Sequence, residues 1–418
     1  MPETTLPLAG VTVLDLTRLP PGGFCTVLLA DLGATVIRVE PPKGRMFDGP
    51  IGLNRGKYSV AVDLRHPRGH EVLRRLAAHA DILVENERPG AMDERGFGYS
   101  QAAAEFPGLI WCSISGYGQD GPYAQWSGHD LAFAAHSGLL SSLNPGLPWY
   151  PQLILPIPVG ATMACVGILA ALRERDRTGA GCQLDISLSE SASWLLSSAD
   201  GILSGPPRGI PSGPDRRLYE CAGGTWIAVT SAEPRTWNAL CDGLGLPDLK
   251  DTVHRWEDPG AVTERLAAEF RTRPAQDWVA DLGPRGASVV RANRGLDLPA
   301  DPHVAARDQL QQVGDVLVPR SPVRIKDRAG QRPPAETFPP PPVGAHTRAV
   351  LAKTGLDPAA IDDLLQSGAI GATADRSLAT RLRHLSLGRG ARGRGGALPG
   401  LVFPDIIRLM GNGTLWRS

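Results

Sequence analysis

A histidine and an aspartate stand side by side in the run SGHDLAFAAHSGLL, at the start of a predicted helix. The turn places His129 and Asp130 at the helix N-terminus, where an imidazole can move a proton and free backbone N–H groups can stabilise a developing oxyanion. On this pattern alone, a core histidine with satisfied hydrogen bonds is the commoner interpretation. His136 lies on roughly the same helix face seven residues later, and packing is its favoured role.

Three other chemical patterns are weaker. Glu233, in AVTSAEPRTW, lies between a strand and a proline-started helix, where an acid is ordinary. His66 and His70 have the four-residue spacing of metal ligands on a helix, but a proline and a glycine separate them and no third ligand is obvious, so we expect a solvated helix start and no metal. Glu40 has the position of a ribose-binding acid, but the turn RLPPGGF lacks the glycine pattern of a dinucleotide site.

Composition limits the classes of function. The 43 basic and 43 acidic residues among 418 cancel, so no global field attracts nucleic acid or anionic lipid. The six cysteines are scattered without a C-x-x-C pair, and the N-terminal residues lack the pattern of a secretory signal. We therefore expect a cytoplasmic protein that binds small molecules or proteins.

The elements that must position these residues form an α/β pattern. Short β-rich runs at 11–16, 35–40, 58–64, 81–86 and 109–118, with helical runs at 22–34 and 66–80, predict a mostly parallel sheet with helices on both faces. Shorter strands alternate with amphipathic helices further on. The expected organisation is a large Rossmann-like domain, a linker, a small α+β domain, a return to the large domain and an extra basic tail. Their respective ranges are 1–200, 201–222, 223–320, 321–371 and 372–418.

The uncharged run from Trp149 to Leu172 is long enough to cross a bilayer. Its three prolines lack backbone donors, which an isolated span in lipid could not compensate. Helix is expected only after Pro158, leaving about 14 apolar residues, a length that suits a buried core helix.

Taken together and in this order, the motifs resemble those of the family III CoA-transferases, the CaiB/BaiF group that includes the α-methylacyl-CoA racemases. The resembling segments include LLADLGATVIRVEPP, GLNRGKYSVAVDL, DILVENERPGAMDERGFGY, SISGYGQDGPYA and GHDLAFAAHSGLL. The resemblance implies an interlocked homodimer of Rossmann-like chains, which needs no separate cofactor and binds coenzyme A as part of its acyl thioester substrate. The CoA contacts that it implies are Arg18, Arg38, Leu64, Arg65, Asn86, Gly90, Met92, Gly116 and Tyr117.

The same resemblance assigns catalytic roles. His129 and Glu233 match the pair that moves a proton on one face of the thioester α-carbon. At the helix start the Asp130 backbone N–H can act as the oxyanion donor of the same site. The reactive Asp of the family falls on Pro156, and no carboxylate occurs between Asp130 and Arg173. A proline cannot form an acyl anhydride or serve as the second base of a racemase.

Two further departures concern the nucleotide end of CoA. Glu94 stands where the family has an arginine, with Arg95 displaced by one position, and Glu87 stands where an aromatic residue is customary. A carboxylate facing phosphates should repel them, which leaves room for a carrier-protein thioester.

These observations favour a diverged, racemase-like enzyme that acts at the α-carbon of an acyl thioester through a one-base site. One alternative is a conventional CoA-transferase or 2-methylacyl-CoA racemase in which another group replaces the missing Asp. A second is a non-catalytic relative that binds thioesters.

Overall fold

The computed structural model describes residues 6–44, 49–140, 155–198, 213–328 and 330–373. The chain divides into two compact units, which are described separately. The large unit comprises Met1–Ser197 and Gln311–Ser418, and the small unit comprises Ser198–Leu310. The expected basic tail after residue 373 and most of the expected linker lie outside the described residues.

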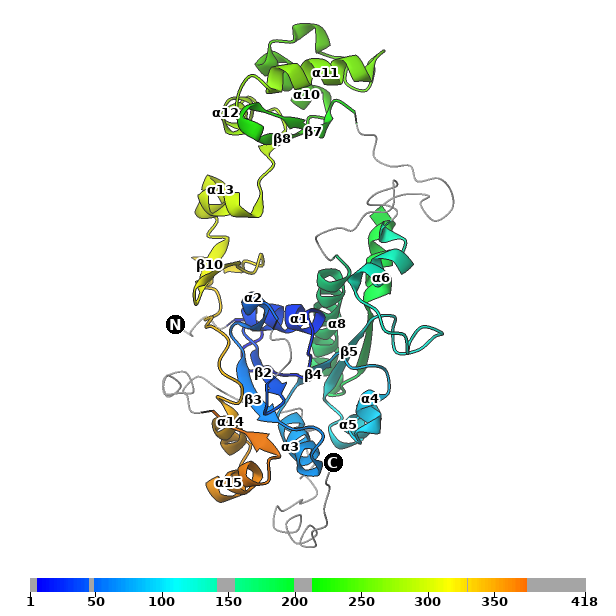
Figure 1. Ribbon diagram of the computed structural model, residues 1–418, viewed down its shortest axis with the longest axis vertical. Helices are drawn as coiled ribbons and strands as arrows, with labels where there is room; N and C mark the ends of the chain where they lie inside the picture. The colour runs from blue at the N-terminus through cyan, green and yellow to red at the C-terminus, as the bar shows by residue number, and fades with distance from the viewer. Residues whose placement is uncertain (1–5, 45–48, 141–154, 199–212, 329, 374–418) are drawn as a thin grey trace. The chain divides into compact units, whose positions relative to one another are not determined.

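A seven-stranded sheet forms the centre of the large unit (Figure 1). Its strand order is β14-β3-β2-β1-β4-β5-β6, and all neighbours are parallel except β14, which pairs antiparallel with β3. The strands are β1 (Thr12–Asp15), β2 (Thr35–Glu40), β3 (Tyr58–Val62), β4 (Ile82–Glu85), β5 (Ile110–Ser115), β6 (Gln183–Ser187) and β14 (Ile370–Gly371). The mostly parallel sheet expected from the sequence is confirmed.

Alternate residues of the central strands feed two hydrophobic cores, one on each face of the sheet. Leu14 and Leu83 belong to one core, and their neighbours Val13 and Ile82 belong to the other. This division follows from the two-residue periodicity of a strand and explains why β1 and β4 are buried on both faces. The first core packs against α3 (Pro67–Ala77), α4 (Ala91–Glu94), α5 (Tyr99–Glu105), α14 (Thr347–Lys353) and α15 (Pro358–Gln366), and the second against α1 (Pro20–Asp31) and α8 (Pro156–Thr178).

The chain order creates a switch point at the centre of the sheet. From β1 the chain continues to β2 and β3 on one side, and then returns to build β4, β5 and β6 on the other. The carboxyl ends of β1 and β4 therefore lie together where the connections diverge. Open parallel sheets bind ligands at such a point.

Helix α8 begins at Pro156, three residues earlier than the start expected after Pro158. The first-turn backbone N–H groups of a helix have no intrahelical acceptor, so prolines at the first and third helical positions remove no hydrogen bond. The first intrahelical bond runs from Val159 N–H to the Leu155 carbonyl. Among the described helices, α8 alone is long and apolar enough to cross a membrane, yet half of its most apolar stretch is buried against the large unit's core.

The small unit is built on a three-stranded antiparallel sheet in the order β7-β8-β9. The strands are β7 (Arg216–Glu220), β8 (Trp226–Thr230) and β9 (Val289–Arg291), and the helices are α10 (Pro234–Leu244), α11 (Pro259–Phe270), α12 (Ala275–Leu282) and α13 (Pro302–Ala306). Trp237 and Phe270, both 0% exposed, fill the core between sheet and helices. The residues of β7 fall inside the range that the sequence suggested as linker. They pair with β8 along the whole strand and therefore form part of the small sheet.

After the small unit the chain forms two hairpins and returns to the large sheet. The hairpins are β10 (Leu310–Val313) with β11 (Val316–Pro319), and β12 (Lys326–Asp327) with β13 (Gly330–Gln331). His346 Nδ1 accepts the Ser59 N–H at 3.1 Å, and Thr347 Oγ1 accepts the Ala61 N–H at 3.0 Å. These bonds satisfy the edge of β3 and attach the returning segment to it.

Candidate functional site

The switch point brings together several of the residues predicted to contact CoA. Arg18 follows β1 and Asn86 follows β4, and the Arg18 N–H donates to Asn86 Oδ1 at 2.9 Å. A small pocket of about 20 Å³ opens beside Arg18, and Arg38 of β2 contributes to its wall. The pocket is lined by Thr17, Arg18, Leu19, Pro20, Gly23, Arg38, Gly49, Pro50, Leu53 and Asn54.

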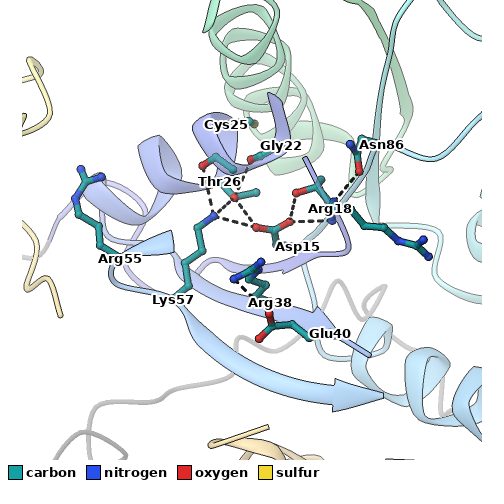
Figure 2. Close-up of polar contacts among 12 residues, drawn as sticks. Asp15, Arg18, Gly22, Cys25, Thr26, Arg38, Glu40, Arg55, Lys57 and Asn86 are labelled. Carbon is teal, nitrogen blue, oxygen red and sulfur yellow. Dashed lines mark hydrogen bonds and ion pairs between the residues drawn. The ribbon is translucent and has the colours of Figure 1, made fainter. Parts of the chain in front are cut away.

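The two arginines of this pocket differ in their surroundings. The Arg38 side chain is 10% exposed and pairs with Glu40 at 3.2 Å, so Glu40 holds the guanidinium in place. The Arg18 side chain is 54% exposed. Figure 2 shows it directed away from the buried Asp15.

Glu87 lies between two arginines directly after β4. Its carboxylate oxygens lie 3.0 Å from Arg18 and 3.3 Å from Arg95, and Arg95 also contacts the sulfur of Met92 at 3.8 Å. Gly90 is the N-cap residue of α4, with φ +83°, a conformation that favours glycine. The predicted contacts Arg18, Asn86 and Met92 therefore form one cluster with Glu87 and Arg95, and Gly90 caps the helix that carries Met92.

Glu94 forms an exposed ion pair in the same segment. Its side chain is 60% exposed and pairs with Arg88, which is 54% exposed. Glu87 is therefore the carboxylate that pairs directly with Arg18 and Arg95, whereas Glu94 pairs directly with Arg88.

Leu64 and Arg65 follow β3. Leu64 is partly buried against the first core, whereas the Arg65 side chain is 83% exposed and pairs with Asp63 at 3.3 Å. Of the two, only Arg65 presents its functional group to solvent.

The His129 turn packs against the turn that carries Gly116 and Tyr117. Asp130 is the first residue of α6 (Asp130–His136), and His129 is its exposed N-cap residue. A Cβ on Gly116 would lie 2.5 Å from the Phe133 ring, and a Cβ on Gly128 would lie 2.8 Å from it. Both glycines are needed for this close approach, which fixes His129 near the end of β5.

The loop before His129 also contacts the segment that carries the arginine cluster. The Gln125 side-chain amide donates to the Pro89 carbonyl at 3.1 Å, one residue before Gly90. The predicted catalytic turn and the predicted CoA-binding segment are thus joined on one edge of the sheet.

His136 closes α6 with a hydrogen bond between Nδ1 and Ser189 Oγ at 2.6 Å. Ser189 belongs to α9 (Leu188–Trp194), which is followed by a short 3-10 turn. Tyr117 and Tyr123 approach the imidazole edge-on, and His136 is exposed.

Pro156 is buried at the first position of α8. The first turn of this helix contains no acid. Glu233 is the exposed N-cap residue of α10 in the small unit, and its carboxylate accepts a hydrogen bond from Thr236 Oγ1 at 3.1 Å. The pairing of Glu233 with His129 remains a prediction.

The side chains of His66 and His70 make hydrogen bonds within their own segment of the chain. His66 caps α3 by accepting the Arg68 N–H, and His70 contacts the Leu64 carbonyl. In the described ranges no group of three or more metal-ligating side chains is found.

Sequence reasoning missed a buried polar network behind the pocket (Figure 2). Lys57 Nζ donates to Asp15 Oδ2 at 3.0 Å and to Thr26 Oγ1 at 2.7 Å, and Thr17 donates to Asp15 Oδ1. Burial lowers the pKa of Lys57, while Asp15 partly offsets this effect. Two sequence features could have indicated this network. They are an acid within the apolar run VTVLDL and a lysine directly before the strand YSVAV. The network connects β1, α1 and β3 beneath the loop that carries Arg18.

Comparison with known proteins identifies the family. The profile described as CoA-transferase family III matches residues 8–347. The chain is 35% identical to human alpha-methylacyl-CoA racemase, over 65% of this chain and 74% of the racemase. It is 31% identical to mouse succinyl-CoA:glutarate CoA-transferase, over 88% of this chain and 91% of that protein. The chain therefore belongs to CoA-transferase family III.

A solved structure gives the same result for the fold. The crystal structure of a CAIB/BAIF family protein from Brucella suis matches with a TM-score of 0.73 and 27% identity, over 84% of this chain and all of that one. The family and the α/β fold expected from the motifs are confirmed. The protein is an enzyme of a family that acts on acyl-CoA thioesters, and its relatives include both transferases and racemases.

Proposed function

We propose that this enzyme removes a proton from the α-carbon of an acyl thioester through a one-base site. His129 is the general base, Glu233 orients its imidazole and raises its basicity, and the Asp130 backbone N–H donates to the enolate oxygen. The carbanion then receives a proton from the same face or from water, or undergoes elimination or carbon–carbon bond formation.

The observation that carries the proposal is the combination of a retained His-Asp turn with an acid-free start of α8. The packing of Gly116 and Gly128 on Phe133 supports a role for His129, because it holds that turn beside the cluster containing Arg18. By the family resemblance the reactive Asp falls on Pro156, and Pro156 is buried at the first position of α8. Without that carboxylate, the site lacks the nucleophile that forms an aspartyl anhydride. It also lacks the acid–base group that delivers a proton from the opposite face.

The test is exchange of thioester α-protons with deuterated water, followed by mass spectrometry. The wild-type protein should exchange them, and His129→Ala should lower the rate about 100-fold or more, as expected for loss of a general base. His136→Ala is the matched control on the same helix and should retain most of the rate. Equal exchange by wild type and His129→Ala would overturn the proposal.

The alternatives predict other products. A transferase with a substitute nucleophile would move labelled CoA to a free acid, and a non-catalytic relative would bind the thioester without exchange, transfer or hydrolysis. We further propose that the enzyme acts in the cytoplasm as an intertwined homodimer, as the family resemblance implies. Light scattering coupled to gel filtration would reveal a monomer if that assembly is wrong.

A further inference from the structure

We propose that Glu87 determines specificity at the nucleotide end of the substrate. Its carboxylate takes the place of a phosphate on Arg18 and Arg95, so that the site favours thioesters of 4′-phosphopantetheine over those of complete CoA. This inference rests on the proposed function in one respect, namely that the arginine cluster receives the carrier group of a thioester.

The geometry makes Glu87 an internal counter-ion. Its two oxygens are divided between the arginines, at 3.0 Å from Arg18 and 3.3 Å from Arg95. The Glu87 side chain is 16% exposed, whereas Arg18 is 54% exposed and Arg95 is 30% exposed. The carboxylate therefore lies beneath the guanidinium groups that a ligand would meet.

The main chain holds Glu87 in this place. Its N–H donates to Glu85 Oε2 at 2.7 Å, and the Glu85 carboxylate is itself buried at the end of β4. The preceding Asn86 accepts the Arg18 N–H. Both partners of the ion pair are thus anchored through backbone groups next to their side chains.

The charge arrangement opposes phosphate binding. Guanidinium groups bind phosphate and carboxylate through the same donors, so an incoming phosphate must displace Glu87 or accept a nearby negative charge. Coenzyme A carries a diphosphate and a 3′-phosphate, whereas 4′-phosphopantetheine carries one phosphate. The free-energy cost of bringing phosphate groups close to Glu87 is therefore larger for CoA. The pantetheine arm and the thioester are common to both ligands.

Glu94 provides a matched comparison. It is also a glutamate paired with an arginine in this segment, but both partners are more than half exposed, and water and salt screen such a pair. Removal of the Glu94 charge should therefore change phosphate binding much less than removal of the Glu87 charge.

The experiment is calorimetric titration of wild type, Glu87→Gln and Glu94→Gln with CoA and with 4′-phosphopantetheine. We expect Glu87→Gln to bind CoA about tenfold more tightly than wild type and 4′-phosphopantetheine about twofold more tightly or less. Glu94→Gln should stay within about twofold for both. Unchanged CoA affinity in Glu87→Gln, or equal tightening for both ligands, would overturn the proposal. Glu87→Ala repeats the test if the glutamine variant melts at a lower temperature.

Wild-type protein is also titrated with a carrier protein bearing 4′-phosphopantetheine, to distinguish a protein-bound source from a free one. Binding of either form at least as tightly as CoA supports the proposal, and weaker binding of both overturns it. None of these measurements needs turnover. If deuterium exchange fails while Glu87→Gln still tightens CoA binding, the proposed function is wrong and the role of Glu87 stands.

Discussion

The ammonium group of Lys57 lies 3.0 Å from the carboxylate of Asp15, and both side chains are only 1% exposed. The pair joins the end of β1 to the start of β3, and Thr26 of α1 contacts both members. Removing one partner of a buried ion pair leaves the other charge without compensation. We expect Lys57→Met to lower the free energy of unfolding by about 3–5 kcal/mol, measured by urea denaturation.

Two further variants decide whether the cause is the unpaired charge. Adding Asp15→Leu to Lys57→Met should recover part of the loss, because both charges are then removed. Lys250→Met, in the exposed Lys250–Asp242 pair, should cost less than about 1 kcal/mol. A Lys57→Met protein as stable as Lys250→Met would contradict the assigned role of the buried pair.

Gly116 tests the contact that positions the His129 turn. Gly116→Ala places a Cβ 2.5 Å from the Phe133 ring, so the ring and the turn must move. We expect a loss of about 1–3 kcal/mol in stability and a fall of at least about tenfold in α-proton exchange. Gly295→Ala is the control, since nothing lies within 4 Å of its added Cβ, and it should preserve both quantities. Full exchange activity in Gly116→Ala would show that this packing is not required.

The large sheet could be predicted from the sequence because its strands carry strong local signals. The runs containing β1, β2, β4 and β5 are short, β-branched and apolar, and the parallel arrangement follows from the helices between them. Helix α8 starts three residues before the predicted position, because the prediction treats Pro158 as a helix breaker whereas first-turn prolines cost no hydrogen bond.

The candidate site was predictable only in part. The resemblance supplied Arg18, Asn86 and Met92, but their gathering around Glu87 depends on two loops that are distant in the sequence. Side-chain directions after β4 and in α4 decide that Glu87, and not Glu94, pairs directly with the arginines of the cluster. Residue identity and local spacing carry no information about that direction.

Glu85 predicts a pH dependence of stability. Burial raises the pKa of Glu85 above its ordinary value of 4.5, while the Ser113 side chain and the Glu87 N–H partly oppose this shift. The folded state therefore holds the proton more tightly than the unfolded state does. The resulting stabilisation is complete below the unfolded pKa and is lost as pH rises through the folded pKa.

Glu85→Gln removes this titration but keeps an oxygen for the Glu87 N–H. Relative to wild type, its urea midpoint should therefore be higher at about pH 7.5 than at about pH 5. Glu174→Gln, at an exposed position of α8, should show no comparable change with pH. A constant difference between Glu85→Gln and wild type at both pH values would rule out Glu85 as the titrating group.

Pro156→Asp tests whether the missing carboxylate accounts for the proposed one-base chemistry. The first position of a helix tolerates an acid, because the nearby N–H groups and the helix dipole favour negative charge. A carboxylate there would supply the second acid–base group that inversion at an α-carbon requires. We expect the variant to interconvert the enantiomers of a 2-methylacyl thioester at least about tenfold faster than wild type, measured by chiral chromatography in deuterated water. Pro158→Asp, two residues later in the same turn, should not gain this activity. If a folded Pro156→Asp protein exchanges the α-proton without inversion, loss of the carboxylate does not explain the difference from the racemases.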